Sequence, residues 1–333
     1  MSVFIDSSIT PLFEAHPITL VDIGARGGLQ PNWAITRKYL RVIGFEPDPI
    51  ECARLREAHD RKHFVYINAA AHRSHSELLL NVARDPGTSS LLAPNKTFLE
   101  QFADSARFDT VEQVKVTADS LDTLLSKHDI QTPDFLKIDT QGAELPILEG
   151  AERVLATSVF GLEVEVQFAA LYQGQSSFGE VETLLHGAGF QLMDLRHAYW
   201  KRARGARYGG SKGQLVFGDA LYFKTERAFQ QQLEAETDEH LCRVRLAHAM
   251  AISLLYGYVD YALELFEPNR QRFDTATAQA IETALRSRVA WNTRLPRFRG
   301  RGRLALLVYR LYKLLLPTAG GWASGGHTLG NLD

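Results

Sequence analysis

The sequence contains little cysteine and no long hydrophobic run. Only two cysteines, Cys52 and Cys242, occur among the 333 residues, and they lie far apart. They form neither a disulfide framework nor a zinc motif, so we expect a reducing compartment and no metal. No run of about 18 apolar residues is present, which argues against a membrane-spanning helix. The first 17 residues carry acids and lack a long apolar core, so we expect no signal peptide and a soluble, cytoplasmic protein.

An excess of charge of one sign is also missing. The 37 Lys and Arg residues nearly balance the 39 Asp and Glu residues, and the net charge is −2. This balance argues against general nucleic-acid binding, although it allows a local basic patch. A chain that is 45% hydrophobic and 23% charged is ordinary globular material, long enough for one large domain or two.

What the sequence does contain is a nucleotide-binding pattern at residues 19–48. An apolar run at 18–23 ends in a glycine-rich segment at 24–28, and a helical segment begins near Pro31. A second apolar run at 42–45 then ends on Glu46. Strand, glycine turn, helix, strand and acid form the unit that binds a nucleotide-like cofactor at the carboxyl edge of a parallel sheet. Glu46 is therefore the predicted ligand of the ribose hydroxyls.

The glycine-rich segment lacks one glycine of the dinucleotide fingerprint GxGxxG, because Arg26 takes the place of the second glycine. That glycine normally lets the backbone approach a pyrophosphate, so its absence favours a ligand without one, such as S-adenosylmethionine. Asp22 is then placed to meet the amino-acid part of this ligand. The pattern alone leaves three interpretations open: a methyltransferase, a nicotinamide oxidoreductase, and glycines that merely form a turn.

Strands and helices alternate as far as residue 224, which predicts an α/β sandwich with a mostly parallel central sheet. Strands are predicted at 18–23, 42–45, 64–71, 78–82, 111–117, 135–138, 159–166, 189–195 and 214–223. Helices are predicted between them, among others at 95–102, 119–127 with Asp119 as its cap, and 142–155. The long polar stretch at 83–110 is expected to be a lid or binding loop, since connectors of that length are usually functional.

The pattern changes at residue 225. Apolar residues at helical spacing predict helices at 226–265, 274–291 and 303–316, with no strand between them. We therefore predict a cofactor-binding domain at 1–224, a helical extension at 225–316 and a flexible, glycine-rich tail at 317–333.

Six segments of the first domain resemble the FkbM family of methyltransferases in order and spacing, over residues 17–224. They read VDIGARGG, IGFEPDP, INAAAHR, FLKIDTQGAELPILEGAERVL, LEVEVQFAALYQGQSSFGEVETLLHGAGFQLMDL and FGDALYF. KIDTQGAE followed by LEGA is the most specific part. The resemblance implies a Rossmann-like enzyme that uses S-adenosylmethionine to methylate hydroxyl oxygens, often on sugars, glycolipids or polyketides. Gln141 departs from the family, which frequently has an acid at this position.

The resemblance also implies the positions of the cofactor ligands. The glycine segment and Glu46 would hold the cofactor, Asn68 and Ala69 would lie beside the adenine, and Asp139 would lie near the methionine part or the acceptor. The site also includes Arg26 from the segment VDIGARGG and Pro47 and Asp48 from the segment IGFEPDP. The predicted cofactor site thus consists of Asp22, Gly24, Arg26, Gly27, Glu46, Pro47, Asp48, Asn68, Ala69 and Asp139.

Methyl transfer to a hydroxyl requires an aligned acceptor oxygen and a group that takes up the hydroxyl proton. Carboxylates at strand ends near the cofactor are the best candidates for this base, so we assign Asp139 and Glu165 as catalytic. A salt bridge or a helix-end contact is the alternative role for Glu165. Glu163, one pleat further inside the same strand, is expected to be structural.

Acceptor-binding residues are expected in the loops at the same edge of the sheet. Ser89 and Ser90 belong to a serine-leucine signature of the FkbM family and would close over the site. Tyr172 and Gln175 lie in the YQGQ element after the strand that carries Glu165. His197 follows the next predicted strand, where either an acceptor contact or a surface role fits.

The end of the chain is both basic and apolar. Residues 294–313 are rich in arginine and contain no acid, and LALLVYRLYKLLLP, from Leu304, is strongly apolar. Such a helix is typical of proteins that lie on a membrane surface, where cations meet anionic headgroups. Packing of 294–316 on the rest of the protein or in a homo-oligomer explains the same pattern and is the first expectation. Contact of 294–316 with the inner face of the membrane is the second, and nucleic acid is not expected.

The sequence as a whole predicts an S-adenosylmethionine-dependent O-methyltransferase. Its partner would be a small-molecule or saccharide acceptor: a sugar, a glycolipid or a related secondary metabolite. Two alternatives remain at this stage: an NAD(P)-dependent Rossmann oxidoreductase, and a catalytically inactive binding protein on the same fold.

Overall fold

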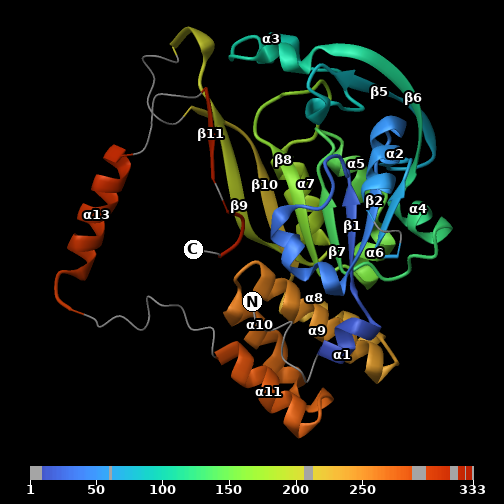
Figure 1. The fold of residues 1–333 in the computed structure, drawn as a ribbon, viewed down its shortest axis with the longest axis vertical. Coiled ribbons are helices and arrows are strands. Elements are labelled where there is room, and N and C mark those ends of the chain that lie inside the picture. The colour runs from blue at the N-terminus through green and yellow to red at the C-terminus, as the bar shows by residue number, and fades with distance from the viewer. Residues whose placement is uncertain are drawn as a thin grey trace.

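A computed structural model describes residues 10–59, 62–205, 213–286, 298–315, 322–326 and 328–331, which form two sheets with helices around them (Figure 1). The large sheet contains β1 (Ile18–Ile23), β2 (Leu40–Phe45), β3 (Phe64–Ile67), β7 (Phe135–Ile138), β8 (Gly161–Gln167), β9 (Phe190–Trp200), β10 (Gln214–Lys224) and β11 (Ala323–Gly325). The small sheet contains β4 (Ala70–His72), β5 (Ser76–Ala83) and β6 (Thr110–Ser120).

The strand order of the large sheet is β11-β9-β10-β8-β7-β1-β2-β3. Within this order, the strands β8, β7, β1, β2 and β3 pair with their neighbours in parallel, whereas β10 runs antiparallel to both β8 and β9. The chain builds β2 and β3 on one side of β1 and then β7 and β8 on the other. The order therefore reverses between β1 and β7, which is where open α/β sheets bind ligands. The predicted Rossmann-like sandwich with a mostly parallel sheet is confirmed.

The central strands β1, β7 and β8 are buried along their whole length, because helices cover both faces of the sheet. Alternate side chains of β1 face opposite layers: Val21 packs in one hydrophobic cluster and Leu20 in the other. The first layer contains α4 (Leu121–Lys127), α5 (Glu144–Glu149), α6 (Glu152–Thr157) and α7 (Phe178–Gly187). The second contains α1 (Thr10–Ala15), α2 (Pro49–Ala58) and η2 (Pro31–Tyr39), a 3₁₀ helix where the sequence predicted an α-helix.

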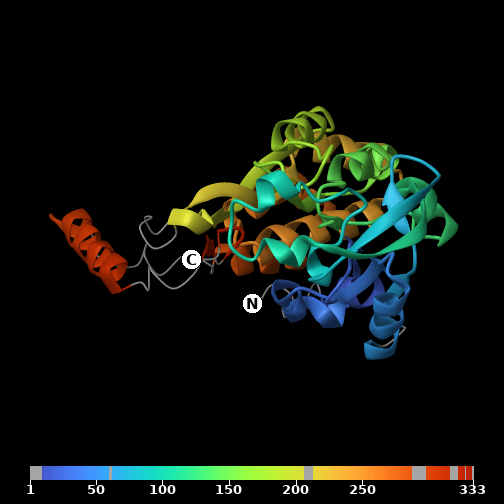
Figure 2. The same ribbon diagram turned by 90° about the horizontal axis from the view of Figure 1, so that it is seen from above.

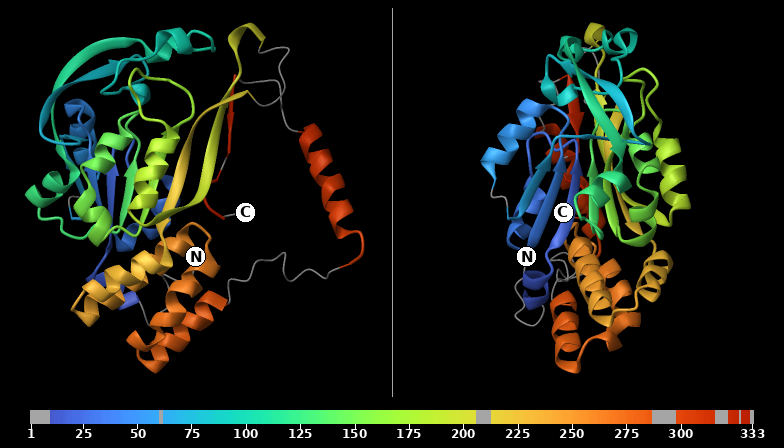
Figure 3. Two further views of the ribbon diagram at one scale, coloured as in Figure 1. Left: turned by 180° about the vertical axis from the view of Figure 1, so that it is seen from behind. Right: turned by 90° about the vertical axis from the view of Figure 1, so that its right-hand side faces the viewer.

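Beyond residue 224 the predicted helical extension is present and shares a core with the sheet. It consists of α8 (Glu226–Ala235), α9 (Glu239–Leu255), α10 (Val259–Phe266), η6 (Glu267–Arg272) and α11 (Thr275–Arg286). These helices lie at the end of the large sheet opposite the small sheet (Figures 1 and 3). Tyr256 stacks on Phe135 of β7, with ring centroids 5.6 Å apart, and Tyr261 stacks on Phe223 of β10. The helix predicted at 226–265 is thus three helices, which fold back to cover this end.

Several other elements differ from their predictions because of contacts distant in sequence. Residues 64–71 form two strands, β3 and β4, in different sheets. The helix predicted at 142–155 is divided into α5 and α6 at Gly150, whose backbone lies against the carbonyl oxygen of His72. Ser120, not Asp119, caps α4: its hydroxyl accepts from Thr123 N at 3.2 Å.

The polar stretch at 83–110 contains three short helical elements above the carboxyl ends of the parallel strands. They are η3 (Pro86–Thr88), α3 (Lys96–Leu99) and η4 (Ser105–Phe108). The helix predicted at 95–102 is therefore a single turn, capped by the side chain of Asn95. Another short 3₁₀ helix, η5 (Ala203–Gly205), follows β9.

The last described helix, α13 (Arg301–Leu315), stands apart from the rest of the chain in all views (Figures 2 and 3). Parts of the predicted segments, including Trp291, Arg294 and Arg297, lie outside the described residues. The prediction of a flexible tail at 317–333 is wrong for residues 323–325, because they form β11 at the edge of the large sheet. In the described part of the chain, no helix is long and apolar enough to cross a membrane.

Candidate active site

A cavity of about 160 Å³ lies at the reversal point of the strand order. The carboxyl ends of β1, β2 and β7 form one side of it, and residues 86–91 form the other. Of the predicted cofactor ligands, Gly24, Arg26, Glu46, Pro47, Ala69 and Asp139 line this cavity, as do Ser89 and Ser90. Apolar side chains of Phe45, Leu80 and Leu91 complete the wall. A pocket with an apolar wall and a few polar groups is the usual form of a cofactor site.

Gly24 connects β1 to this cavity at a point where no side chain fits. Its φ is +79°, and a Cβ atom would lie 2.0 Å from the carbonyl oxygen of Asp139. The ends of β1 and β7 therefore touch through this glycine, and the backbone of the turn forms part of the cavity wall.

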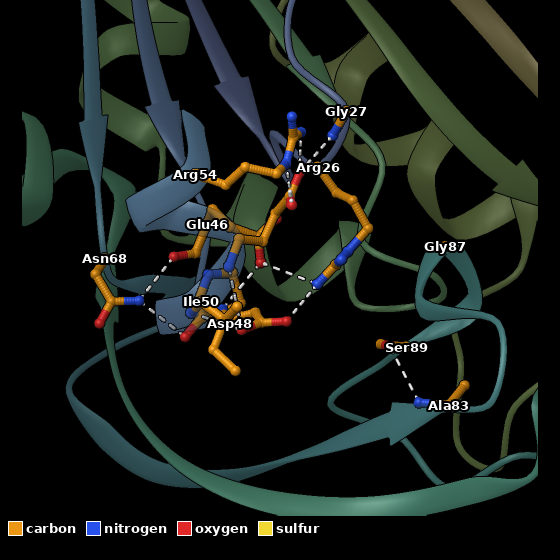
Figure 4. Close-up of polar contacts among 12 residues, drawn as sticks. Arg26, Gly27, Glu46, Asp48, Ile50, Arg54, Asn68, Ala83, Gly87 and Ser89 are labelled. Atoms are coloured by element: carbon orange, nitrogen blue, oxygen red, sulfur yellow. Dashed lines mark hydrogen bonds and ion pairs between the residues drawn. The ribbon is translucent and has the colours of Figure 1, made fainter. Parts of the chain in front are cut away.

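Three charged side chains stand at the end of β2 (Figure 4). Arg26 Nη2 lies 2.6 Å from Asp48 Oδ2 and 3.9 Å from Glu46 Oε1. Glu46 Oε1 also accepts a hydrogen bond from Asp48 N at 2.9 Å. Burial raises the pKa of Glu46 to about 7, although the Asp48 amide and Arg26 oppose this shift. Glu46 is therefore a buried hydrogen-bond acceptor at the position predicted for a ribose ligand.

The remaining predicted cofactor ligands support the cavity without lining it. Asn68 Nδ2 donates to the carbonyl oxygens of Glu46 and Pro47, each at 2.9 Å, so its amide fixes the end of β2 (Figure 4). Gly27 N donates to Glu51 Oε1 at 3.0 Å. Asp48 caps α2 and holds Arg26.

Lys137, which sequence reasoning missed, connects two of the predicted acids. Its Nζ lies 3.4 Å from Asp22 Oδ1 and 3.6 Å from Asp139 Oδ2, although Lys137 is buried in β7. Burial alone lowers the pKa of Lys137, but Asp22 and Asp139 outweigh it and raise the pKa above its ordinary value. Burial raises the pKa of Asp22 to about 6 against the opposing charge of Lys137. The base of the cavity thus carries a charged network.

Asp139 and Glu165 are brought together by Gln141. The Gln141 amide nitrogen donates to Asp139 Oδ1 at 2.9 Å and to Glu165 Oε1 at 3.0 Å. Glu165 is buried and also accepts from Gln167 Nε2 at 2.7 Å. Burial, followed by repulsion from Asp139, raises the pKa of Glu165 well above its ordinary value. Of the two carboxylates, only Asp139 lines the cavity, and its side chain is 35% exposed.

Glu163, on the same face of β8, has a different environment. Its carboxylate accepts from Tyr256 Oη at 3.0 Å and from Gln30 Nε2 at 3.2 Å. These contacts join the sheet to the helical extension, in keeping with the structural role expected for Glu163.

The serines predicted to bind the acceptor hold the loop that covers the cavity. Ser90 Oγ donates to the carbonyl oxygen of Gln141 at 2.7 Å, and Ser89 Oγ accepts from Ala83 N at 3.1 Å. Figure 4 places Ser89 across the site from Arg26 and Glu46. Ser90 thus connects this loop to the turn that carries Gln141.

Tyr172 and Gln175 lie behind the carboxylates rather than in the cavity wall. Tyr172 Oη donates to Gln141 Oε1 at 2.9 Å, and Gln175 binds the backbone of Ala169 and Tyr172. His197 is further away: β9 extends to Trp200, so His197 lies within the strand and not after it. It lines a separate hollow with Tyr258 and Gly330.

Among the described residues, no three His, Cys, Asp or Glu side chains are grouped so as to hold a metal ion. Gly24, Glu46 and Asp139 instead line a cavity at the carboxyl ends of the parallel strands, and Lys137 is buried beside Asp139.

The family model for the methyltransferase FkbM domain matches residues 22–192, which is more than half of the chain. The protein therefore belongs to the FkbM methyltransferase family. The predicted resemblance to this methyltransferase family is confirmed, and the match argues against a nicotinamide oxidoreductase. Among curated proteins, no relative matches the chain.

Solved structures with a similar fold include an FkbM methyltransferase from Methylobacillus flagellatus KT, at 16% identity and a TM-score of 0.35. That match covers 62% of this chain and 43% of the other, so this chain spans less than half of that relative. Magnesium protoporphyrin IX methyltransferase from Synechocystis PCC 6803 matches at 8% identity and a TM-score of 0.32, over 66% of this chain and 78% of the other. Likenesses this low carry no conclusion about the acceptor.

Proposed function

We propose that the protein transfers the methyl group of S-adenosylmethionine to a hydroxyl oxygen of a sugar, a glycolipid or a related secondary metabolite. The observation that carries this proposal is the link that Gln141 makes between Asp139, which lines the cavity, and the buried Glu165 behind it. A hydroxyl becomes strongly acidic only as its new bond forms, so a base placed at this point assists the transfer.

In the proposed step, the acceptor oxygen forms a bond to the methyl carbon while the carbon–sulfur bond breaks and its electron pair passes to sulfur. The hydroxyl proton passes to Asp139, which is the exposed member of the pair. Glu165 is buried, so its role in this step is to hold Gln141, whose amide orients Asp139. The products are the methyl ether and S-adenosylhomocysteine.

The residues of the cavity fit the proposed cofactor. Glu46 offers a buried carboxylate to two ribose hydroxyls, and the apolar side chains of Phe45 in β2 and Leu80 in β5 offer a surface for adenine. Asp22 and Lys137 lie together below the turn, where the charged amino and carboxylate groups of the methionine part would be placed. The loop of Ser89 and Ser90 would cover the bound cofactor.

Two experiments test this function. Calorimetric titration with S-adenosylmethionine, S-adenosylhomocysteine and NAD should show binding of the first two and none of the third. Transfer of a radiolabelled methyl group to a cell-envelope extract should then depend on Asp139. Binding of the cofactor without transfer to any component of that extract would favour a binding protein, and binding of NAD alone would reject the proposal.

We also propose that α13 lies on an anionic membrane surface. Leu304, Leu307, Val308 and Leu311 follow the i, i+3, i+4, i+7 spacing of one helix face, and each is at least 52% exposed. Arg303 and Arg310, seven residues apart, lie along one border of this face. An apolar stripe bordered by cations fits the boundary between acyl chains and anionic headgroups.

Sedimentation with liposomes tests this placement. The whole chain should sediment with vesicles that contain phosphatidylserine and remain in solution with neutral vesicles, and deletion of residues 294–333 should abolish sedimentation. Arg303→Gln with Arg310→Gln should weaken binding most at low salt. A chain that dimerises through these residues and ignores vesicles would show instead that α13 packs against a second copy.

A further inference from the structure

Arg107, in η4, has an environment that no part of the proposed reaction explains. Its guanidinium carbon lies 4.8 Å from the ring centre of Phe108, 5.0 Å from that of Trp200 and 4.9 Å from that of Trp322. The three rings come from the loop at 83–110, from β9 and from the C-terminal segment. They form an aromatic box around one cation.

Among the described residues, the Arg107 cation forms no ion pair, although Asp104, Asp85 and Glu165 lie at longer range. Its Nε is buried without a hydrogen-bond partner, and no described carboxylate lies within ion-pair distance of the guanidinium. Burial lowers the pKa of Arg107, while the more distant acids Asp104 and Asp85 oppose this shift. Other arginines of this region are satisfied: Arg84 pairs with Asp109 at 3.7 Å, and Arg202 donates to Gln214 at 2.7 Å.

A half-buried guanidinium whose Nε has no acceptor is unfavourable, because its lost hydration is replaced only in part by the faces of the rings. Arg107 therefore offers unused donors to an anionic oxygen. Its planar fork matches a carboxylate or a phosphate, which a lysine at this position would match less well.

The box lies next to the candidate active site. The Arg107 carbonyl oxygen accepts from Asp85 N at 2.9 Å and from Thr88 Oγ1 at 3.1 Å, in the loop that covers the cofactor cavity. The Phe108 ring contacts the ring of Tyr172, at 6.0 Å between centroids, and Tyr172 donates to Gln141. One aromatic layer therefore separates Arg107 from the carboxylate pair.

We infer that Arg107 is the anion-binding residue of a subsite for an acidic sugar, in which the rings of the box hold the guanidinium and Arg107 binds the carboxylate or phosphate. This inference rests on the proposed function, because it treats the box as part of the acceptor site. A methyltransferase with this subsite selects acidic saccharides over neutral ones. Arg107 is then the residue that determines this specificity.

Calorimetry and tryptophan fluorescence on the whole chain, saturated with S-adenosylhomocysteine, test the subsite. Glucuronate and glucose 6-phosphate are the probes, glucose is the neutral control, and inorganic phosphate tests the anion alone. We expect both acidic sugars to bind at least about tenfold more tightly than glucose, as for a charge-assisted hydrogen bond. A preference for one of the two probes identifies the anionic group.

Arg107→Gln should remove this preference, and Arg107→Lys should restore it only in part. Arg84→Gln is the matched control, since Arg84 is an exposed, paired arginine of the same region, and it should bind the acidic sugars as the unchanged protein does. Three results overturn the subsite: glucose binds as tightly as the acidic sugars, neither acidic sugar binds, or inorganic phosphate binds as tightly as glucose 6-phosphate. So does an Arg107→Gln variant that melts earlier but keeps its affinity for the acids, because Arg107 would then only brace the rings. Affinity for S-adenosylhomocysteine, measured in the same variants, reports separately on the proposed function.

Discussion

The carboxylates of Asp139 and Glu165 share one hydrogen-bond donor, the side-chain amide of Gln141, at 2.9 and 3.0 Å. Asp139 directly follows β7 and lines the cavity, and Glu165 lies in the neighbouring strand β8. Their negative charges would repel one another without the amide between them. A neutral Gln141 therefore suits this pair, whereas an acid at 141 would add a third negative charge.

Gln141→Met removes the shared donor and keeps the size of the side chain. Because a hydrogen bond to a charged group contributes about 1.5 to 3 kcal/mol, we expect the methylation rate to fall by at least about tenfold. Affinity for S-adenosylhomocysteine, measured by calorimetry, should change little. Gln232→Met is the control, because Gln232 is a buried glutamine of α8 in the helical extension, and its amide donates to the carbonyl oxygen of Ala156. Equal loss of rate in both variants would show that Gln141 has no special position.

Gly24 and Gly27 provide a matched pair at the glycine turn. Both have positive φ, but a Cβ at 24 meets the Asp139 carbonyl at 2.0 Å, whereas a Cβ at 27 has nothing within 4 Å. Gly27→Ala should cost about 1 to 2 kcal/mol of unfolding free energy, from the backbone conformation alone. Gly24→Ala should cost at least about 3 kcal/mol and also abolish cofactor binding, because β1 and β7 must separate. Urea denaturation measures both. Similar values for the two variants would contradict the close approach.

Cofactor affinity should depend on pH through Glu46. Its pKa is about 7 in the free protein, so below pH 7 the carboxylate is protonated and must lose its proton to accept two ribose hydroxyls. Affinity for S-adenosylhomocysteine should therefore be constant above pH 7 and fall about tenfold per pH unit below it. Glu46→Gln should weaken binding of S-adenosylhomocysteine by at least about 1 kcal/mol at pH 8 and remove the fall in affinity below pH 7. A pH profile unchanged by the substitution would place the titrating group elsewhere, with Asp22, whose pKa is about 6, as the next candidate.

The sequence predicts those parts of the site that depend on local pattern. The glycine turn, Glu46 at the end of β2 and Asp139 at the end of β7 each follow directly from an apolar run that ends in a polar residue. Parallel strands bring such ends to one edge, so these residues meet in the cavity.

Other parts depend on contacts that no local pattern reports. Gln141 reaches both acids from a left-handed backbone conformation, with φ of +58°, which no sequence motif indicates. In the sequence, Lys137 resembles an exposed strand residue. In the fold, β1 pairs with β7 and places Asp22 directly beside Lys137. The error at His197 has the same origin, because pairing with β10 and β11 extends β9 to Trp200.

The contact between the helical extension and the sheet is also testable. Tyr256 Oη donates to the buried Glu163 at 3.0 Å and accepts from Trp33 Nε1 at 3.2 Å. Tyr256→Phe leaves both partners without this hydroxyl, so we expect a loss of about 1 to 3 kcal/mol of unfolding free energy. Cofactor affinity should change little, because Glu163 does not line the cavity, although it is in register with Lys137 of the charged network. Tyr258→Phe, which removes a less buried hydroxyl that donates to the Met193 carbonyl, is the control and should cost less. If Tyr256→Phe weakens cofactor binding instead, then the helical extension influences the active site through β8.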